Sequence, residues 1–153
     1  MLWLHLLSTG VFVGATAGLA LFAVPRARGH KEGSARRTSV SRALRIYDPL
    51  AIALLGIMVM TGAWSVTGYK QDLGVDYFAA FGHHLAWKLG LAFLVVMTGT
   101  YVCFGLGHRL VRQEEWGEPV DERKLSSMLA RLSASAWLTV GLTLATIAVA
   151  AGR

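Results

Sequence analysis

Two adjacent histidines and a lysine stand at the head of an apolar segment, FAAFGHHLAWKLGLAF, which runs from residue 78 to 93. The imidazoles are His83 and His84, and the ammonium group is Lys88. On a helix, Lys88 lies on the same face as His84, one turn and about 6 Å further along. Ionisable groups in so apolar a stretch are costly and usually face the interior of a helix bundle with a partner. We therefore interpret the three side chains as part of a cofactor or metal site.

A further histidine, His5, lies about one turn into the apolar segment that opens the chain. Neutral imidazole is a common axial ligand of haem iron and a good ligand for copper. We expect His5 and His84 to meet at a similar depth as the ligand pair, with His83 as the alternative to His84. Lys88 would then pair with a carboxylate of a tetrapyrrole. The competing interpretation is that the histidines cap a helix at the membrane interface and that Lys88 extends towards the headgroups.

The elements that must position these residues follow from composition. The mean hydropathy is +0.49 and 54% of the residues are hydrophobic, which is outside the range of an ordinary soluble domain. The apolar residues fall into four blocks, and each is long enough to cross a hydrocarbon core of about 30 Å as a helix. The sequence therefore predicts an all-α integral membrane protein, an up-down-up-down four-helix bundle forming one transmembrane domain over residues 1–153. The expected spans are residues 2–24, 50–68, 78–106 and 132–151.

Basic residues in the connections predict the orientation. The first connection carries Arg26, Arg28, Lys31, Arg36, Arg37, Arg42 and Arg45, the third carries Arg109, Arg112, Arg123, Lys124 and Arg131, and the middle one carries Lys70. Under the positive-inside rule, the first and third connections face the cytoplasm, so both termini lie on the outer, periplasmic side of a bacterial inner membrane. Topology and contact with anionic lipid explain the net charge of +6 without a nucleic-acid partner.

Local signals set the expected helix boundaries. Pro25 is expected to end the first helix, and residues 29–41 to form a polar, basic linker. Asp48 and Pro49 are expected to be the N-cap and first-turn proline of the second helix. Gly10, Gly14 and Gly18 recur at four-residue steps, a pattern that favours close approach of a neighbouring helix or of a flat macrocycle. Gly14 is accordingly included among the candidate cofactor contacts.

Several motifs are similar to those of a known family. LHLL at residues 4–7, Gly14, Gly18 and VPR at residues 24–26 resemble the opening helix of the copper-resistance-D-like (CopD) superfamily of small integral membrane proteins. The related HemJ-type protoporphyrinogen oxidase is similar in its first-helix histidine, the Pro-Arg that follows, an early second-helix proline and a third-helix Lys-Leu pair. The third-helix histidine of that oxidase has Ala86 at its position here, and Ser133, Ala134 and Ser135 replace its Asn-Glu-Pro. The resemblance implies haem b binding through His5.

The sequence thus predicts a membrane haem b-binding protein that transfers electrons, alone or as a subunit of a redox complex. If it is an enzyme, an oxidoreductase is expected, and its partners would be the lipid bilayer and other membrane redox proteins. One alternative is a copper-binding or copper-transporting protein that uses the same histidines with Met58 or Met60, since thioethers are soft ligands for Cu(I). The others are a HemJ-like oxidase and a non-catalytic structural subunit of a membrane complex.

Overall fold

The computed structural model describes the backbone of residues 2–151, and their side chains except at 69, 72, 73, 77–81, 84 and 151. Apart from the connections at residues 29–32 and 116–121, residues 2–151 are helical, and they contain no strand. Four helical runs are long and apolar enough to cross a membrane: Leu2–Arg28, Gly33–Gly68, Leu85–Glu115 and Glu122–Ala150. The prediction of an all-α chain with four helices able to span a membrane is confirmed.

The first and third runs are each built from three helical pieces, and the second and fourth are single helices. The first joins α1 (Leu2–Gly18), a π-helix η1 (Leu19–Ala23) and α2 (Val24–Arg28). The second is α3 (Gly33–Leu73), which a 3₁₀ turn η2 (Gly74–Asp76) connects to α4 (Tyr77–Thr100). A second π-helix η3 (Tyr101–Gly107) leads from α4 into α5 (His108–Glu115), and α6 (Glu122–Ala151) completes the chain.

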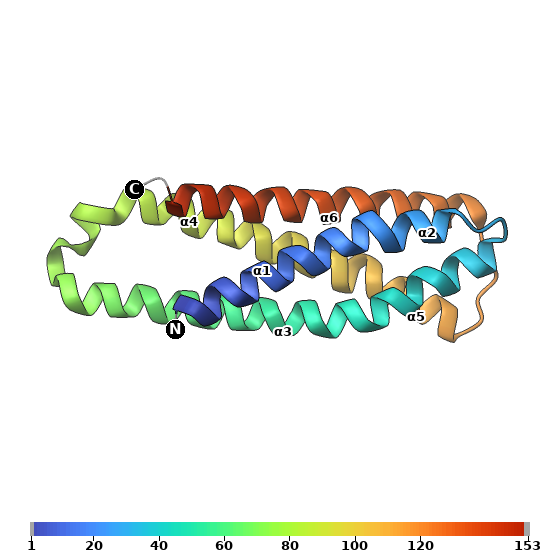
Figure 1. The fold of residues 1–153 in the computed structure, drawn as a ribbon, viewed down its shortest axis with the longest axis horizontal. Coiled ribbons are helices and arrows are strands. Elements are labelled where there is room, and N and C mark those ends of the chain that lie inside the picture. The colour runs from blue at the N-terminus through green and yellow to red at the C-terminus, as the bar shows by residue number, and fades with distance from the viewer. Residues whose placement is uncertain (1, 152–153) are drawn as a thin grey trace.

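Consecutive long runs point in alternating directions along one bundle axis (Figure 1). In the ribbon, the start of α1 and the end of α6 lie at the same end of the bundle, and the hairpin of α3, η2 and α4 projects beyond both (Figure 1). Helix α1 packs mainly against α3, and α4 packs mainly against α6. Because no Cα atom of α1 lies within 8 Å of one in α4 in the described residues, these two helices stand diagonally across the bundle.

Phe12 fills the space between the diagonal helices. Its side chain is fully buried, and a Cβ added at Gly99 of α4 would lie 3.3 Å from its Cζ and 3.0 Å from Cδ1 of Leu55. Gly99 therefore leaves the room into which the ring of Phe12 extends. This contact joins α1, α3 and α4 at the centre of the bundle.

The two prolines do not mark helix ends, so both predicted boundaries are wrong. Helical structure continues past Pro25 to Arg28, after the π-helix in which the amide of Val24 donates to the carbonyl of Leu19. Helix α3 begins at Gly33 and runs for 41 residues with Pro49 inside it, so most of the predicted linker is helical. Val40, Leu44 and Tyr47, which precede Pro49 on one face of α3, are buried. The burial of this apolar face stabilises the helix well before Pro49.

The glycine repeat on the first helix does not meet a neighbouring helix. A Cβ at Gly10, Gly14 or Gly18 would find no described atom within 4 Å. The predicted close helix approach at these residues is therefore wrong, because the buried face of α1 is formed instead by Ser8, Thr9, Phe12 and Thr16.

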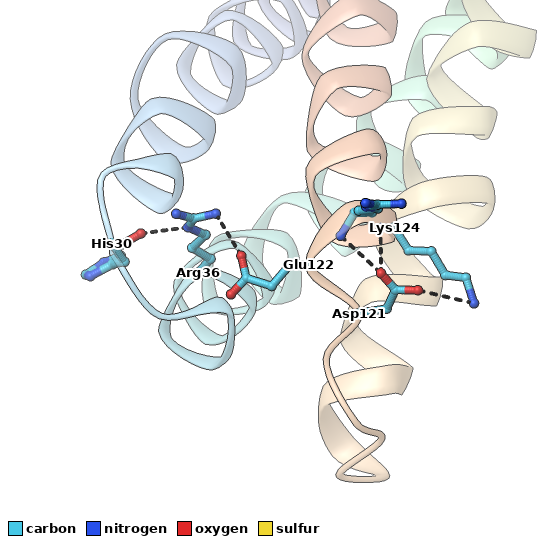
Figure 2. A network of polar contacts seen from close by, with 6 residues as sticks. His30, Arg36, Asp121, Glu122 and Lys124 are labelled. Atoms are coloured by element: carbon cyan, nitrogen blue, oxygen red, sulfur yellow. Dashed lines mark hydrogen bonds and ion pairs between the residues drawn. The ribbon is translucent and has the colours of Figure 1, made fainter.

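Ion pairs connect the basic first half of α3 to the chain around residues 114–122. Arg45 contacts Glu114 at 3.2 Å and Glu115 at 3.3 Å, and Arg37 donates to the carbonyl of Glu118 at 2.7 Å. Figure 2 shows Arg36 between the carbonyl of His30, at 2.6 Å, and the carboxylate of Glu122, at 3.4 Å. Exposed pairs of this kind contribute little stability individually, but together they hold the α5–α6 connection against α3.

Asp121 caps the N-terminus of α6. Its Oδ1 accepts hydrogen bonds from the amides of Arg123 at 3.0 Å and Lys124 at 3.2 Å, and Figure 2 shows the carboxylate beside Lys124. The amide of Lys124 and then that of Arg123 stabilise the ionised form and lower the pKa of Asp121. The ionised side chain thus satisfies two of the helix's otherwise unpaired amides.

Replacing Asp121 by alanine should fray the first turn of α6. We expect faster hydrogen exchange at the amides of residues 123 and 124 in D121A, and nearly normal exchange in D121N, which keeps a capping oxygen. Because the folded-state pKa is lowered, the ionised cap stabilises the helix above the ordinary Asp value of about 3.9 and is lost as the pH falls through the lower folded value. E118A, which removes an exposed carboxylate that makes no capping bond, is the control; equal fraying in both variants would contradict this role.

Candidate functional site

His5 is held by α3. The structure places its imidazole on the buried side of α1, half-buried, with 2.8 Å between Nδ1 and Oγ1 of Thr61. A Cβ added at Gly62 would lie 3.7 Å from Cε1 of His5, so the ring packs beside the backbone of α3. A hydrogen bond and a packing contact thus fix the ring from the same helix.

The hydrogen bonds of Thr61 favour one tautomer of the His5 imidazole. The hydroxyl of Thr61 donates to the carbonyl of Ile57 at 2.7 Å, with Met58 as a more distant acceptor at 3.2 Å. A threonine hydroxyl has one proton, and when that proton is donated to the carbonyl of Ile57, the oxygen accepts from His5 and the neutral imidazole carries its hydrogen on Nδ1. Its Nε2 then presents a lone pair, and it makes no hydrogen bond with any described residue.

The backbone around His5 is also fixed by hydroxyl groups. Ser8 donates to the carbonyl of His5 at 3.0 Å and Thr9 donates to it at 2.7 Å, and both side chains are buried. An imidazole with Nδ1 bonded to an acceptor and Nε2 open is the arrangement that proteins use for metal-ligating histidines.

The third-helix candidates lie in the first turns of α4. His83 is exposed and Lys88 is half-buried, whereas the side chain of His84 lies outside the described part of the structure. Thr61 stands twelve residues before the end of α3 at Leu73, or about 18 Å from it. Helix α4 returns from the hairpin in the opposite direction, and the residue that lies the same distance from its start at Tyr77 is about Leu89. Lys88 is therefore close to the level of His5, whereas His84 lies about 7 Å nearer the tip of the hairpin.

The structure brings His5 together with α3, and in the described residues no Cα atom of α1 lies within 8 Å of one in α4. The pairing of His5 with His84 or His83 as ligands stays a prediction. Within the described part of the chain, no group of three or more His, Cys, Asp or Glu side chains is close enough to hold a metal ion. Gly14 is exposed and stands nine residues after His5, about two and a half turns, so it faces the opposite side of α1.

A second polar cluster lies deeper in the bundle, and sequence reasoning missed it. The hydroxyls of Thr16 and Tyr47 are 3.0 Å apart, and both side chains are buried. The next residue, Asp48, faces the π-helix η3, where the thiol of Cys103 lies against its carboxyl group. Oδ1 of Asp48 is buried and has no hydrogen-bond partner among the described residues.

Asp48 was predicted to be an N-cap, and that assignment is wrong because α3 passes through it. The signal that could have identified it is the spacing of Val40, Leu44, Tyr47 and Ala51, an apolar stripe of helical period that continues across Pro49. A carboxyl group beside such a stripe must be buried at least in part. Ionisable side chains inside membrane helices usually carry a function, so Asp48 joins the candidate residues.

Comparisons with known protein families, curated proteins and solved structures found no match for this chain.

Because η3 packs closely against Asp48, we expect that adding one methyl group at Gly107 of η3 will destabilise the protein. A Cβ at Gly107 would lie 2.7 Å from both carboxylate oxygens of Asp48, so Gly107→Ala forces a short, partly buried side chain to move. We expect it to lower the free energy of unfolding by about 1–3 kcal/mol, measured by denaturation of the purified protein in detergent. Gly141→Ala on α6, where a Cβ would meet nothing within 4 Å, is the matched control. A smaller loss in G107A than in G141A would show that the contact is not there.

Proposed function

We propose that this chain is a membrane haem b-binding protein, related to the CopD-like superfamily, which transfers electrons alone or as a subunit of a redox complex. The observation that carries the proposal is the state of His5. Its Nδ1 lies 2.8 Å from the hydroxyl oxygen of Thr61, and its Nε2 has no hydrogen-bond partner in the described residues.

The setting of His5 meets a requirement for holding a b-type haem. A histidine that holds haem iron must be neutral and fixed in one orientation, and a bond from its Nδ1–H to Thr61 would supply both conditions. Such a bond also raises the basicity of the other nitrogen, which favours coordination. When bound, haem iron supplies one-electron redox chemistry.

Lys88 is the proposed partner of a haem propionate. It is half-buried and near the level of His5 along the bundle, and an ammonium group binds a carboxylate through a charge-assisted hydrogen bond. His84 is the proposed second axial ligand, with His83 as the alternative.

The positive-inside rule supports an orientation in which this site is near the outer face. The basic connections between the first and second runs and between the third and fourth would lie in the cytoplasm. Both termini and the α3–α4 hairpin would then be periplasmic, where a redox partner could approach.

Absorption spectra test the proposal directly. Protein purified from a haem-replete host should show a Soret band, and His5→Ala should remove most of it, because the axial ligand is lost. His108→Ala, which removes an exposed histidine of α5, should leave the band unchanged. A wild-type protein with no Soret band would rule out haem, and copper enrichment in the same material after copper loading would favour the copper-binding alternative.

The hydrogen bond from His5 predicts a second, smaller effect. Thr61→Val keeps the shape of the side chain but removes the acceptor, and we expect haem affinity to fall by about 10–100-fold. Thr67→Val is the control on the same helix, because the Thr67 hydroxyl bonds only to the carbonyl of Ala63 and is exposed. Haem titration of the two apoproteins measures the difference; equal affinities would show that Thr61 does not support the ligand.

A further inference from the structure

A groove lies between the first helical run and the first half of α3, at the end of the bundle opposite His5. Its volume is about 840 Å³, within the range of about 300–1,000 Å³ that small-molecule sites occupy. One wall comes from α1, η1 and α2, and the other from α3. We call it the α1–α3 groove. It is separate from the residues proposed to hold haem.

Both walls change from apolar to basic in the same direction. On the first run, the lining passes from Gly18 and Phe22 to Arg26, and on α3 it passes from Leu50 and Ile46 to Arg42. Phe22 and Ile46 are 72% and 70% exposed, so the apolar half opens to the surroundings of the bundle. His30 lines the basic end together with the two arginines.

The positive charges of Arg26 and Arg42 are not neutralised by any side chain that the structure describes. Three other arginines of α3, Arg36, Arg37 and Arg45, bind Glu122, a backbone carbonyl and two glutamates respectively. Arg26 and Arg42 have no acidic partner among the described residues. Two guanidinium groups that face one cavity without a counter-charge form a binding site for an anion.

We propose that the α1–α3 groove binds one anionic phospholipid, with its phosphate on Arg26 and Arg42 and an acyl chain along the apolar half. Charge complementarity selects the headgroup. The exposed apolar walls belong to helices able to span a membrane, which places the groove where acyl chains are available. A soluble phosphate ester would leave the apolar half of the groove without a ligand group, so a lipid fits better.

Gly18 keeps the apolar half open. A Cβ at this position would meet nothing within 4 Å, and Gly18 lines the groove. A large side chain there would occupy the space of the acyl chain without altering any charge. The groove therefore offers separate tests of its two ends.

Native mass spectrometry of the full chain in neutral detergent micelles, titrated with one lipid at a time, tests the site. Wild-type protein should bind one phosphatidylglycerol with at least tenfold preference over phosphatidylcholine. The double variant R26Q/R42Q should lose at least about tenfold in phosphatidylglycerol affinity, since each arginine near a headgroup contributes about 1 kcal/mol. R28Q/R109Q removes the same charge from exposed residues outside the groove, and should stay within about twofold of wild type.

Gly18→Leu tests the apolar half and remains informative if the arginine variant fails to fold. We expect it to weaken phosphatidylglycerol binding severalfold with unchanged helix content. Equal losses in the two double variants would show diffuse attraction instead of a site and overturn the proposal. Binding of glycerol 3-phosphate as tight as that of the lipid, or binding by G18L as tight as by wild type, would also overturn it.

Discussion

The requirement that every backbone amide and carbonyl be satisfied without water governs this chain. In hydrocarbon, an unpaired backbone group costs several kcal/mol, so each crossing must be helical throughout. The helices accordingly continue past Pro25 and through Pro49, and the chain changes to π-helix at Leu19–Ala23 and Tyr101–Gly107 without breaking. Hydroxyl side chains follow the same constraint, as Thr16, Thr61 and Thr139 all donate to a carbonyl one turn back.

Two hydrogen bonds between side chains join α1 to α3. His5 bonds to Thr61 at one level and Thr16 bonds to Tyr47 at another, and the α1–α3 groove lies beyond them. By contrast, the hydroxyls of Thr139 and Thr143 on α6 donate to carbonyls of their own helix. The α1–α3 pair therefore holds His5 and the groove, whereas Lys88 and His84, the other residues proposed to bind haem, belong to α4. Asp48 belongs to α3 and faces the π-helix η3 of the third run.

The apolar blocks predicted the four helices, since length and hydropathy are local properties of the sequence. They did not predict the helix ends, because Val40, Leu44 and Tyr47 stabilise α3 through burial, and burial depends on neighbours distant in the chain. His5 was identified as a candidate from its type and depth alone. Its partner Thr61 was not identified. The register between α1 and α3 depends on how the two helices pack, and the sequence of neither helix alone indicates that register. Gly14 was selected by its spacing, and that spacing places it on the side of α1 away from His5.

The central claim is that Thr61 holds His5 as the neutral tautomer with hydrogen on Nδ1 and a free lone pair on Nε2. Nitrogen NMR of the ¹⁵N-histidine-labelled apoprotein at neutral pH, with the His5 signals assigned by comparison with His5→Ala, measures this tautomer directly. We expect a protonated Nδ1 and an unprotonated Nε2 in the wild type, and a mixture of tautomers in Thr61→Val. A wild-type His5 with its hydrogen on Nε2 would contradict the account, since no lone pair would then face the site.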